Sequence, residues 1–214
     1  MSKVSFLLVL GVLWIASILK GQAQDKKLRT WTTVNIEHKL KPVFTLSAGL
    51  EWRAKNNLSQ TDRLGLKMGA SYDPFSFLKM KAGYEVHYRN REYGIWRFRH
   101  RYHLEGTLLT RLQQIKFALR ERFQHTIDGG NNELRMRSRF KLAYDIPKCK
   151  PEPYVSVEMY NSLEGKDHFD IKRMRYRSGV CLPVSNWTAD IFYCFQKERD
   201  ESRHIIGLEF VYEF

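Results

Sequence analysis

The chain has 214 residues, with 36 Lys and Arg against 23 Asp and Glu, so its formal net charge is +13. Its length suits a single domain, and its three cysteines exclude a disulfide-rich scaffold. A nucleic-acid-binding protein would gather its basic residues on one face of a soluble fold. Here the basic residues alternate with apolar ones along most of the chain, so we expect no nucleic-acid partner.

The first 23 residues have the three parts of a secretory signal. A basic start precedes an apolar stretch over residues 6–19, and the small residues Gly21 and Ala23 flank a cleavage point. The apolar stretch is shorter than the roughly 20 residues that a spanning helix needs. We therefore expect a signal peptide, residues 1–23, that is removed on export, and one mature domain over residues 24–214.

The mature chain consists of runs in which apolar and polar residues alternate, separated by turn-forming residues. Every run is long enough to cross a bilayer as a tilted strand, for which ~9 to 11 residues suffice. The predicted strands are residues 28–39, 42–54, 62–73, 77–90, 94–109, 112–126, 133–145, 152–162, 169–182, 187–198 and 203–214.

The run over residues 94–109 indicates which face of the strands meets lipid. Trp96 and Phe98 share one face, and Arg97 and Arg99 share the other. A soluble sandwich turns its apolar face inward, whereas a barrel in lipid turns it outward. The runs are longer than soluble strands, and short connectors alternate with longer polar ones, as in outer-membrane barrels. We therefore expect the apolar face to meet lipid and the charged face to line the lumen.

The predicted fold is all-β: a transmembrane, antiparallel, up-and-down β-barrel of about ten to twelve strands, in the outer membrane of a Gram-negative bacterium. A chain whose ends both lie in the periplasm needs an even number of strands. Eleven runs therefore leave three alternatives: one run does not span, one strand is missed, or the first and last strands pair in parallel. The short turns, expected on the periplasmic side, are predicted at residues 41–42, 73–74, 110–111 and 183–185, and a long loop at 126–132.

The expected lumen wall is ionic with a basic excess. Its basic residues are Lys81, Arg97, Arg99, Arg101, Arg120, Arg122, Arg135, Arg137, Arg139, Arg173, Arg175 and Arg177. Its acidic residues are Glu85, Glu105, Glu133, Glu158, Asp190 and Glu209. Two interpretations remain open: a salt-bridged plug that makes the barrel structural, or a narrow, porin-like pore for a small anionic solute, because rings of Arg and Lys select anions.

Three polar residues fall on the predicted lipid face: His100, Glu121 and Ser138. If the hairpins turn about residues 110–111 and 129–130, His100 lies opposite Glu121, and Glu121 lies opposite Ser138. Such residues suit acyl hydrolysis of lipids, but this order leaves Ser138 roughly 10 Å from His100. A phospholipase-like hydrolase is therefore an alternative only, and an enzyme is not favoured over a polar belt at the membrane interface.

The three cysteines, Cys149, Cys181 and Cys194, can form at most one disulfide. They lack the spacing of a metal site, and isolated thiols that fill small volumes are the simpler interpretation. We predict neither a metal nor a cofactor.

Several segments resemble a known family. The export signal, Trp-Thr-Thr at 31–33, Arg-His-Arg at 99–101, Arg-Glu-Arg at 120–122 and the closing residues 207–214 are similar to the Bacteroidota outer-membrane barrel family catalogued as a domain of unknown function. The resemblance implies fold and location, and it brings no activity.

The closing residues also predict how the chain is inserted into the membrane. Phe210, Tyr212 and Phe214 resemble the C-terminal signal that outer-membrane insertion machinery reads. The expected partners are therefore outer-membrane lipid, the barrel-assembly machinery and periplasmic chaperones. A loop-mediated adhesin or receptor is a further alternative.

Overall fold

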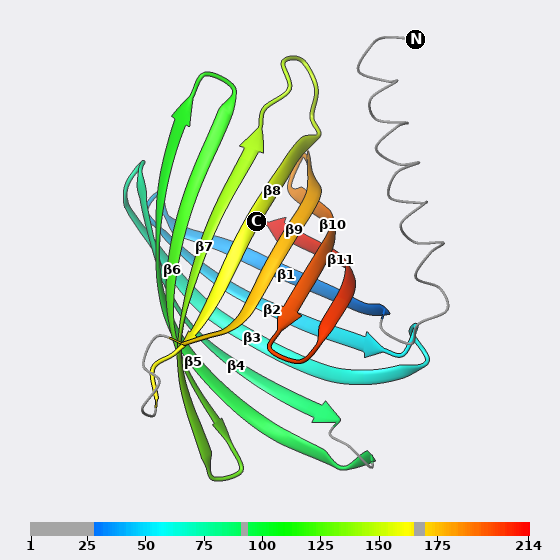
Figure 1. The fold of residues 1–214 in the computed structure, drawn as a ribbon. Coiled ribbons are helices and arrows are strands. Elements are labelled where there is room, and N and C mark those ends of the chain that lie inside the picture. The colour runs from blue at the N-terminus through cyan, green and yellow to red at the C-terminus, as the bar shows by residue number, and fades with distance from the viewer. Residues whose placement is uncertain (1–27, 91–93, 165–169) are drawn as a thin grey trace.

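The computed structural model describes residues 28–90, 94–164 and 170–214, which form one closed barrel of eleven strands (Figure 1). The predicted signal peptide, residues 1–23, lies outside the described residues. None of the described residues forms a helix that is long and apolar enough to cross a membrane. The strands are β1 (Leu28–Lys41), β2 (Phe44–Lys55), β3 (Gln60–Phe75), β4 (Leu78–Asn90), β5 (Trp96–Leu112), β6 (Ile115–Asp128), β7 (Asn131–Tyr144), β8 (Glu152–Ser162), β9 (Ile171–Val184), β10 (Trp187–Glu198) and β11 (Ser202–Glu213).

Each strand follows one predicted run of alternating residues. The strands have 11 to 17 residues, about twice or more the five or six usual in soluble proteins. Large apolar side chains point outward, and Leu50 and Leu104 are 65% and 63% exposed. Charged and polar side chains point inward, where Glu51 and Gln124 are 4% and 2% exposed. The apolar face is therefore outside and the ionic face inside, as the sequence predicts.

The barrel closes through a parallel pairing of β1 with β11, in which Thr32 lies opposite Leu208. All the other strand pairs are antiparallel. The prediction of an antiparallel barrel is thus wrong at the closing pair, and the third alternative is confirmed. The reason is parity, because in an up-and-down barrel with an odd number of strands the first and last strands point the same way.

The two ends of the barrel have different connections. At the end where β11 finishes, which we call the short-turn end, two-residue turns join four strand pairs, and residues 145–151 join β7 to β8. The opposite end, which we call the loop end, is where β1 begins, since the Asn57 N–H donates to the Leu28 carbonyl at 3.2 Å. The two ends of the barrel-forming chain, Leu28 and Phe214, therefore lie at opposite ends of the barrel.

Three predicted connections are wrong in position. The turn expected at residues 73–74 lies at 76–77, because β3 continues to Phe75, which pairs with Leu78. The turn expected at residues 110–111 lies at 113–114, because Leu112 pairs with Ile115 and Gln113 adopts a left-handed φ of 52°. The loop expected at 126–132 is a tight turn at 129–130. Both of its glycines have positive φ, 59° and 99°, which lets the strands continue to the turn.

An apolar cluster packs inside the otherwise ionic lumen, and alternation alone did not predict it. Trp31, Tyr154, Phe192, Cys194 and Ile205 are all buried there. The thiol of Cys194 thus fills part of the packed interior. All three cysteines are free: Cys149 is exposed, Cys181 is half-buried and Cys194 is buried.

Glycines in the wall make room for the inward-pointing rings. Gly207 lies opposite Phe192, and a Cβ at Gly207 would lie 1.9 Å from the Phe192 Cζ. Gly83 lies opposite His103, whose ring would come within 2.3 Å of a Cβ there. A side chain at either glycine would displace a ring, so these glycines are required for packing.

We expect Gly207→Ala to destabilise the barrel by about 1 to 3 kcal/mol, because the added methyl group overlaps the Phe192 ring. Gly106→Ala is the matched control, since no described atom lies within 4 Å of a Cβ at that position. Urea unfolding in detergent micelles measures both changes. Equal destabilisation by the two substitutions would contradict this account of Gly207.

The difference in length between the connections at the two ends also predicts which residues are reached from outside the cell. With the short turns in the periplasm, a membrane-impermeant maleimide should label Asn57→Cys, in a Cys149→Ser background, on intact cells. The native Cys149, exposed between β7 and β8, should react only after the cells are permeabilised. The reverse pattern would invert the assigned orientation.

Candidate functional site: an ionic cavity in the barrel lumen

The barrel contains a cavity of about 1100 Å³. Nineteen Lys and Arg residues and ten Asp and Glu residues line it, so the lining carries nine more positive than negative groups. The structure places all twelve predicted basic residues in this lining: Lys81, Arg97, Arg99, Arg101, Arg120, Arg122, Arg135, Arg137, Arg139, Arg173, Arg175 and Arg177. Five of the predicted acidic residues line it as well: Glu85, Glu105, Glu133, Glu158 and Glu209.

The cavity extends along most of the barrel, from Glu37, four residues before the short-turn end of β1, to the loop end. Asp62, Asn90 and Asp128, at or near the loop-end limits of their strands, belong to the lining. The sixth predicted acidic residue, Asp190, lies outside the lining, where it accepts a hydrogen bond of 2.8 Å from the Tyr154 hydroxyl. Lys79, near the short-turn end, is also outside it. We infer that the cavity opens toward the loop end.

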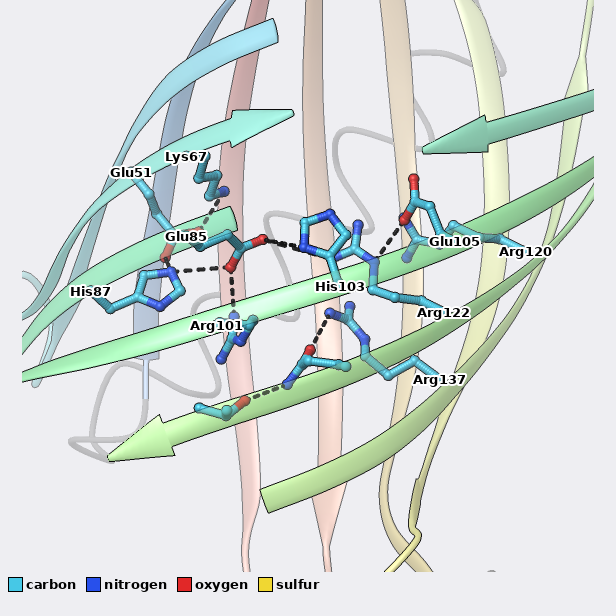
Figure 2. Close-up of polar contacts among 12 residues, drawn as sticks. Glu51, Lys67, Glu85, His87, Arg101, His103, Glu105, Arg120, Arg122 and Arg137 are labelled. Carbon is cyan, nitrogen blue, oxygen red and sulfur yellow. Dashed lines mark hydrogen bonds and ion pairs between the residues drawn. The ribbon is translucent and has the colours of Figure 1, made fainter. Parts of the chain in front are cut away.

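Two buried carboxylates, Glu51 and Glu85, contact positive groups on β2 to β5. Glu51 contacts Arg53 Nε and Arg63 Nε, both at 2.9 Å, and Lys67 Nζ at 2.7 Å. Figure 2 shows Glu85 among His87, His103 and Arg101, and the Arg101 Nη1 atom lies 2.8 Å from a Glu85 oxygen. Each carboxylate therefore holds several donors from neighbouring strands in fixed positions.

The two histidines beside Glu85 are functional candidates that sequence analysis missed. His87 is fully buried and His103 is 6% exposed, and each lies over a wall glycine, Gly65 or Gly83. Alternation places both rings on the polar face but gives them no role. A glycine lies directly opposite each ring, and this pairing is the feature from which the two histidines could have been identified.

Two further carboxylates, Glu105 on β5 and Glu158 on β8, organise the adjoining wall from β5 to β8. Glu105 contacts Arg122 Nε at 2.6 Å and Arg120 Nη1 at 3.8 Å. Glu158 contacts Arg120 Nη2 at 2.6 Å and Arg137 Nη2 at 2.9 Å. Arg120 thus bridges the two carboxylates. Buried charges of this kind are tolerated when they are paired and hydrogen-bonded, as they are here.

Four arginines stand directly side by side on four consecutive strands, and we call them the arginine row. Arg53 on β2 lies opposite Arg63 on β3, which lies opposite Arg89 on β4, which lies opposite Arg97 on β5. Like charges directly opposite each other are unfavourable in a sheet. Arg53 and Arg63 share Glu51, whereas in the described part of the chain Arg89 and Arg97 form no ion pair. The row therefore presents uncompensated positive charge to the cavity.

The structure separates the three polar residues predicted on the lipid face. Ser138 and Glu121 lie opposite each other, and the serine hydroxyl donates a hydrogen bond of 2.7 Å to the carboxylate. The expected pairing of His100 with Glu121 is wrong, because the shifted turn places His100 opposite Ile127. His100 instead contacts the Tyr84 hydroxyl through Nδ1, at 2.7 Å. These residues do not form a catalytic triad.

The predicted C-terminal signal lies at the short-turn end. The Tyr212 ring packs against Trp187 in a tilted arrangement, with ring centroids 4.6 Å apart, and the Phe214 N–H donates to the Glu37 carbonyl at 3.0 Å. Phe210 lies opposite Val34 of β1 in the parallel pair. Within the described residues, no group of three or more His, Cys, Asp or Glu side chains is arranged to hold a metal ion.

We expect Glu158→Gln to destabilise the barrel by about 3 to 5 kcal/mol, because it leaves several buried guanidinium groups without their carboxylate. The control is Glu213→Gln, which removes an exposed ion pair with Lys39 and should cost less than about 1 kcal/mol. Thermal unfolding of the purified barrel compares the two. A Glu158→Gln barrel as stable as the Glu213→Gln barrel would refute the role of Glu158.

Comparison with solved structures shows a shared fold. The chain is similar to the translocator domain of the autotransporter NalP from Neisseria meningitidis, with a TM-score of 0.57 and 13% identity over 80% of this chain and 76% of that chain. It is also similar to LpxR from Salmonella typhimurium, with a TM-score of 0.51 and 10% identity over 79% of this chain and 83% of that chain. Both are outer-membrane barrels, and at these identities the likeness concerns the fold.

Comparison with curated proteins gives no match. A family model described as a protein of unknown function, DUF2490, matches residues 28–205, which include β1 to β10 and the start of β11. The chain therefore belongs to the DUF2490 family, and its fold is a closed eleven-stranded barrel of the outer-membrane type.

Proposed function

We propose that this protein is an outer-membrane barrel whose basic lumen admits small anionic solutes from the loop end, as a narrow anion-preferring pore. The observation that carries the proposal is the arginine row. Arg89 and Arg97 face the cavity in register, and within the described residues they lack a carboxylate partner. Fixed positive groups in a narrow passage select anions.

The charge of the whole lining supports the same function. A plug that satisfies itself would balance its charges and leave little free volume. This lumen instead carries an excess of nine positive groups around a cavity of about 1100 Å³. Mobile anions that enter the cavity would compensate this charge.

The proposed location follows from the fold and from the sequence. Residues 1–23 act as a signal peptide, and export delivers the mature chain to periplasmic chaperones and the barrel-assembly machinery of a Gram-negative, Bacteroidota-type cell. Phe210, Tyr212 and Phe214 supply the C-terminal insertion signal. Outer-membrane lipid then covers the exposed apolar side chains of the barrel.

The alternatives have less support. A lipid-face hydrolase would need a base beside Ser138, and His100 contacts Tyr84 instead. An adhesin acting through residues 126–132 would need a long loop there, and the connection is a two-residue turn. The hydrolase and the adhesin therefore each lack a feature that they require.

Planar-bilayer recording with the purified barrel tests the proposal. We expect small, anion-selective conductance steps. Arg89→Gln with Arg97→Gln should lower the ratio of anion to cation permeability by about fivefold, since one charge at ~4 Å in water contributes ~1 kcal/mol. The control is Lys197→Gln, which removes one positive charge from the exposed outer surface of β10 near the same end.

The proposal fails if the bilayer stays silent, if the steps select cations, or if the double variant keeps the selectivity of the unaltered barrel. Reduced selectivity in Lys197→Gln of the same size would also count against it. That result would assign the effect to surface charge outside the lumen.

A further inference from the structure

Glu158 sits in a crowded part of the lumen wall. One of its oxygens, Oε1, contacts Arg120 and Arg137, at 2.6 and 2.9 Å. The other, Oε2, accepts a hydrogen bond of 2.8 Å from the Tyr160 hydroxyl and lies 3.5 Å from Arg175 Nη1. Both oxygens of this one carboxylate are therefore occupied by donors.

Arg139 lies beside Glu158 but is not among the donors that contact its oxygens. It stands directly opposite Glu158 on β8 and directly opposite Arg120 on β6. Within the described residues it nevertheless forms no ion pair, because other donors occupy the carboxylate beside it. Its side chain lines the cavity. A half-buried guanidinium with five donors thus faces the free volume of the lumen.

The surroundings of Arg139 concentrate positive charge. Arg120, Arg137, Arg139 and Arg175 gather around the single carboxylate of Glu158, and all four line the cavity. Four guanidinium groups surround this carboxylate, and of the four only Arg120 also contacts a second one among the described residues, Glu105 at 3.8 Å, so the group carries an excess of positive charge. Removing charges from water is costly unless they are compensated, so this part of the lumen favours a bound anion.

The chemistry of the donors favours one kind of anion. A guanidinium group is a planar fork whose spacing matches two oxygens of a phosphate or carboxylate. A compact, doubly charged oxyanion can accept bonds from several guanidinium groups at once and compensates more charge than a chloride or an acetate ion. The group around Glu158 therefore fits a phosphate better than a monovalent anion.

We propose that Arg139, together with the guanidinium groups that surround Glu158, forms a subsite for a phosphate-type oxyanion deep in the lumen. This inference rests on the proposed function, because the anion reaches Arg139 through the cavity. It goes further in naming the chemical class of the solute and the residue that holds it. The ligand is either free phosphate or the phosphoryl group of a small solute.

Isothermal titration calorimetry with the full-length barrel in nonionic detergent, at constant ionic strength, tests the subsite. Inorganic phosphate should bind saturably, and acetate should bind far more weakly. Arg139→Gln should lower the affinity for phosphate by about tenfold or more, as expected for the loss of a hydrogen bond to a charged group. Arg139→Lys keeps the charge but loses the planar guanidinium fork. Its affinity for phosphate should lie between that of the unaltered barrel and that of Arg139→Gln.

The matched control is Lys79→Gln. Lys79 also points into the barrel, but it lies near the short-turn end, outside the cavity lining, and its substitution removes the same charge. Its affinity for phosphate should stay within about twofold of that of the unaltered barrel, because distant charges are screened by salt. Titration with glycerol phosphate identifies the source, since tighter binding than inorganic phosphate assigns a phosphorylated solute and weaker binding assigns the free ion.

The subsite is refuted if phosphate does not bind saturably, if acetate binds as well as phosphate, or if Lys79→Gln weakens binding as much as Arg139→Gln. Conductance separates this failure from that of the proposed function. Anion-selective steps without phosphate binding would leave the pore intact and remove only the subsite. A silent bilayer together with saturable, Arg139-dependent binding would support a closed binding pocket in place of a pore.

Discussion

The structure depends on one constraint: a closed barrel with an apolar outer face has to balance its inward charges within its own lumen. Side chains that point into a closed wall can find ionic partners only on other inward-facing positions, so the inward arginines and lysines depend on carboxylates inside the lumen. Glu51, Glu85, Glu105 and Glu158 meet this requirement by each holding donors from several strands. The resulting network ties the wall together across strands that are far apart in sequence.

The same constraint governs the packing of the uncharged side chains. Phe192, His87 and His103 are too large to share the lumen with side chains on every neighbouring strand, and each lies over a glycine. At these positions a large ring on one strand therefore lies opposite a glycine on the neighbouring strand. Removal of a ring or filling of a glycine would disturb the ionic network as well, because His87 and His103 contact Glu85 directly.

The network balances the charge of the lumen only in part. The positive charge that remains is the basis of the proposed function. A fold shared with NalP and LpxR at 13% and 10% identity supplies a wall and a lumen but no activity, because unrelated functions use the same fold. In this chain the candidate for a function is the set of arginines left over once the carboxylates are occupied. Arg89 and Arg97 lie toward the loop end, and Arg139 lies deeper along the wall.

The sequence by itself determined the strands and their faces, because period-two alternation is a local property that each run carries independently. It also assigned Arg137 and Glu158 to the lumen side. It did not determine the closure between β1 and β11, the three-residue shift of the turn at Gln113, or the pairing of His100 with Tyr84. Only the tertiary structure decided which cation each carboxylate holds and which arginines stay unpaired, since a shift in register changes every partner across the strands while leaving the alternation unchanged.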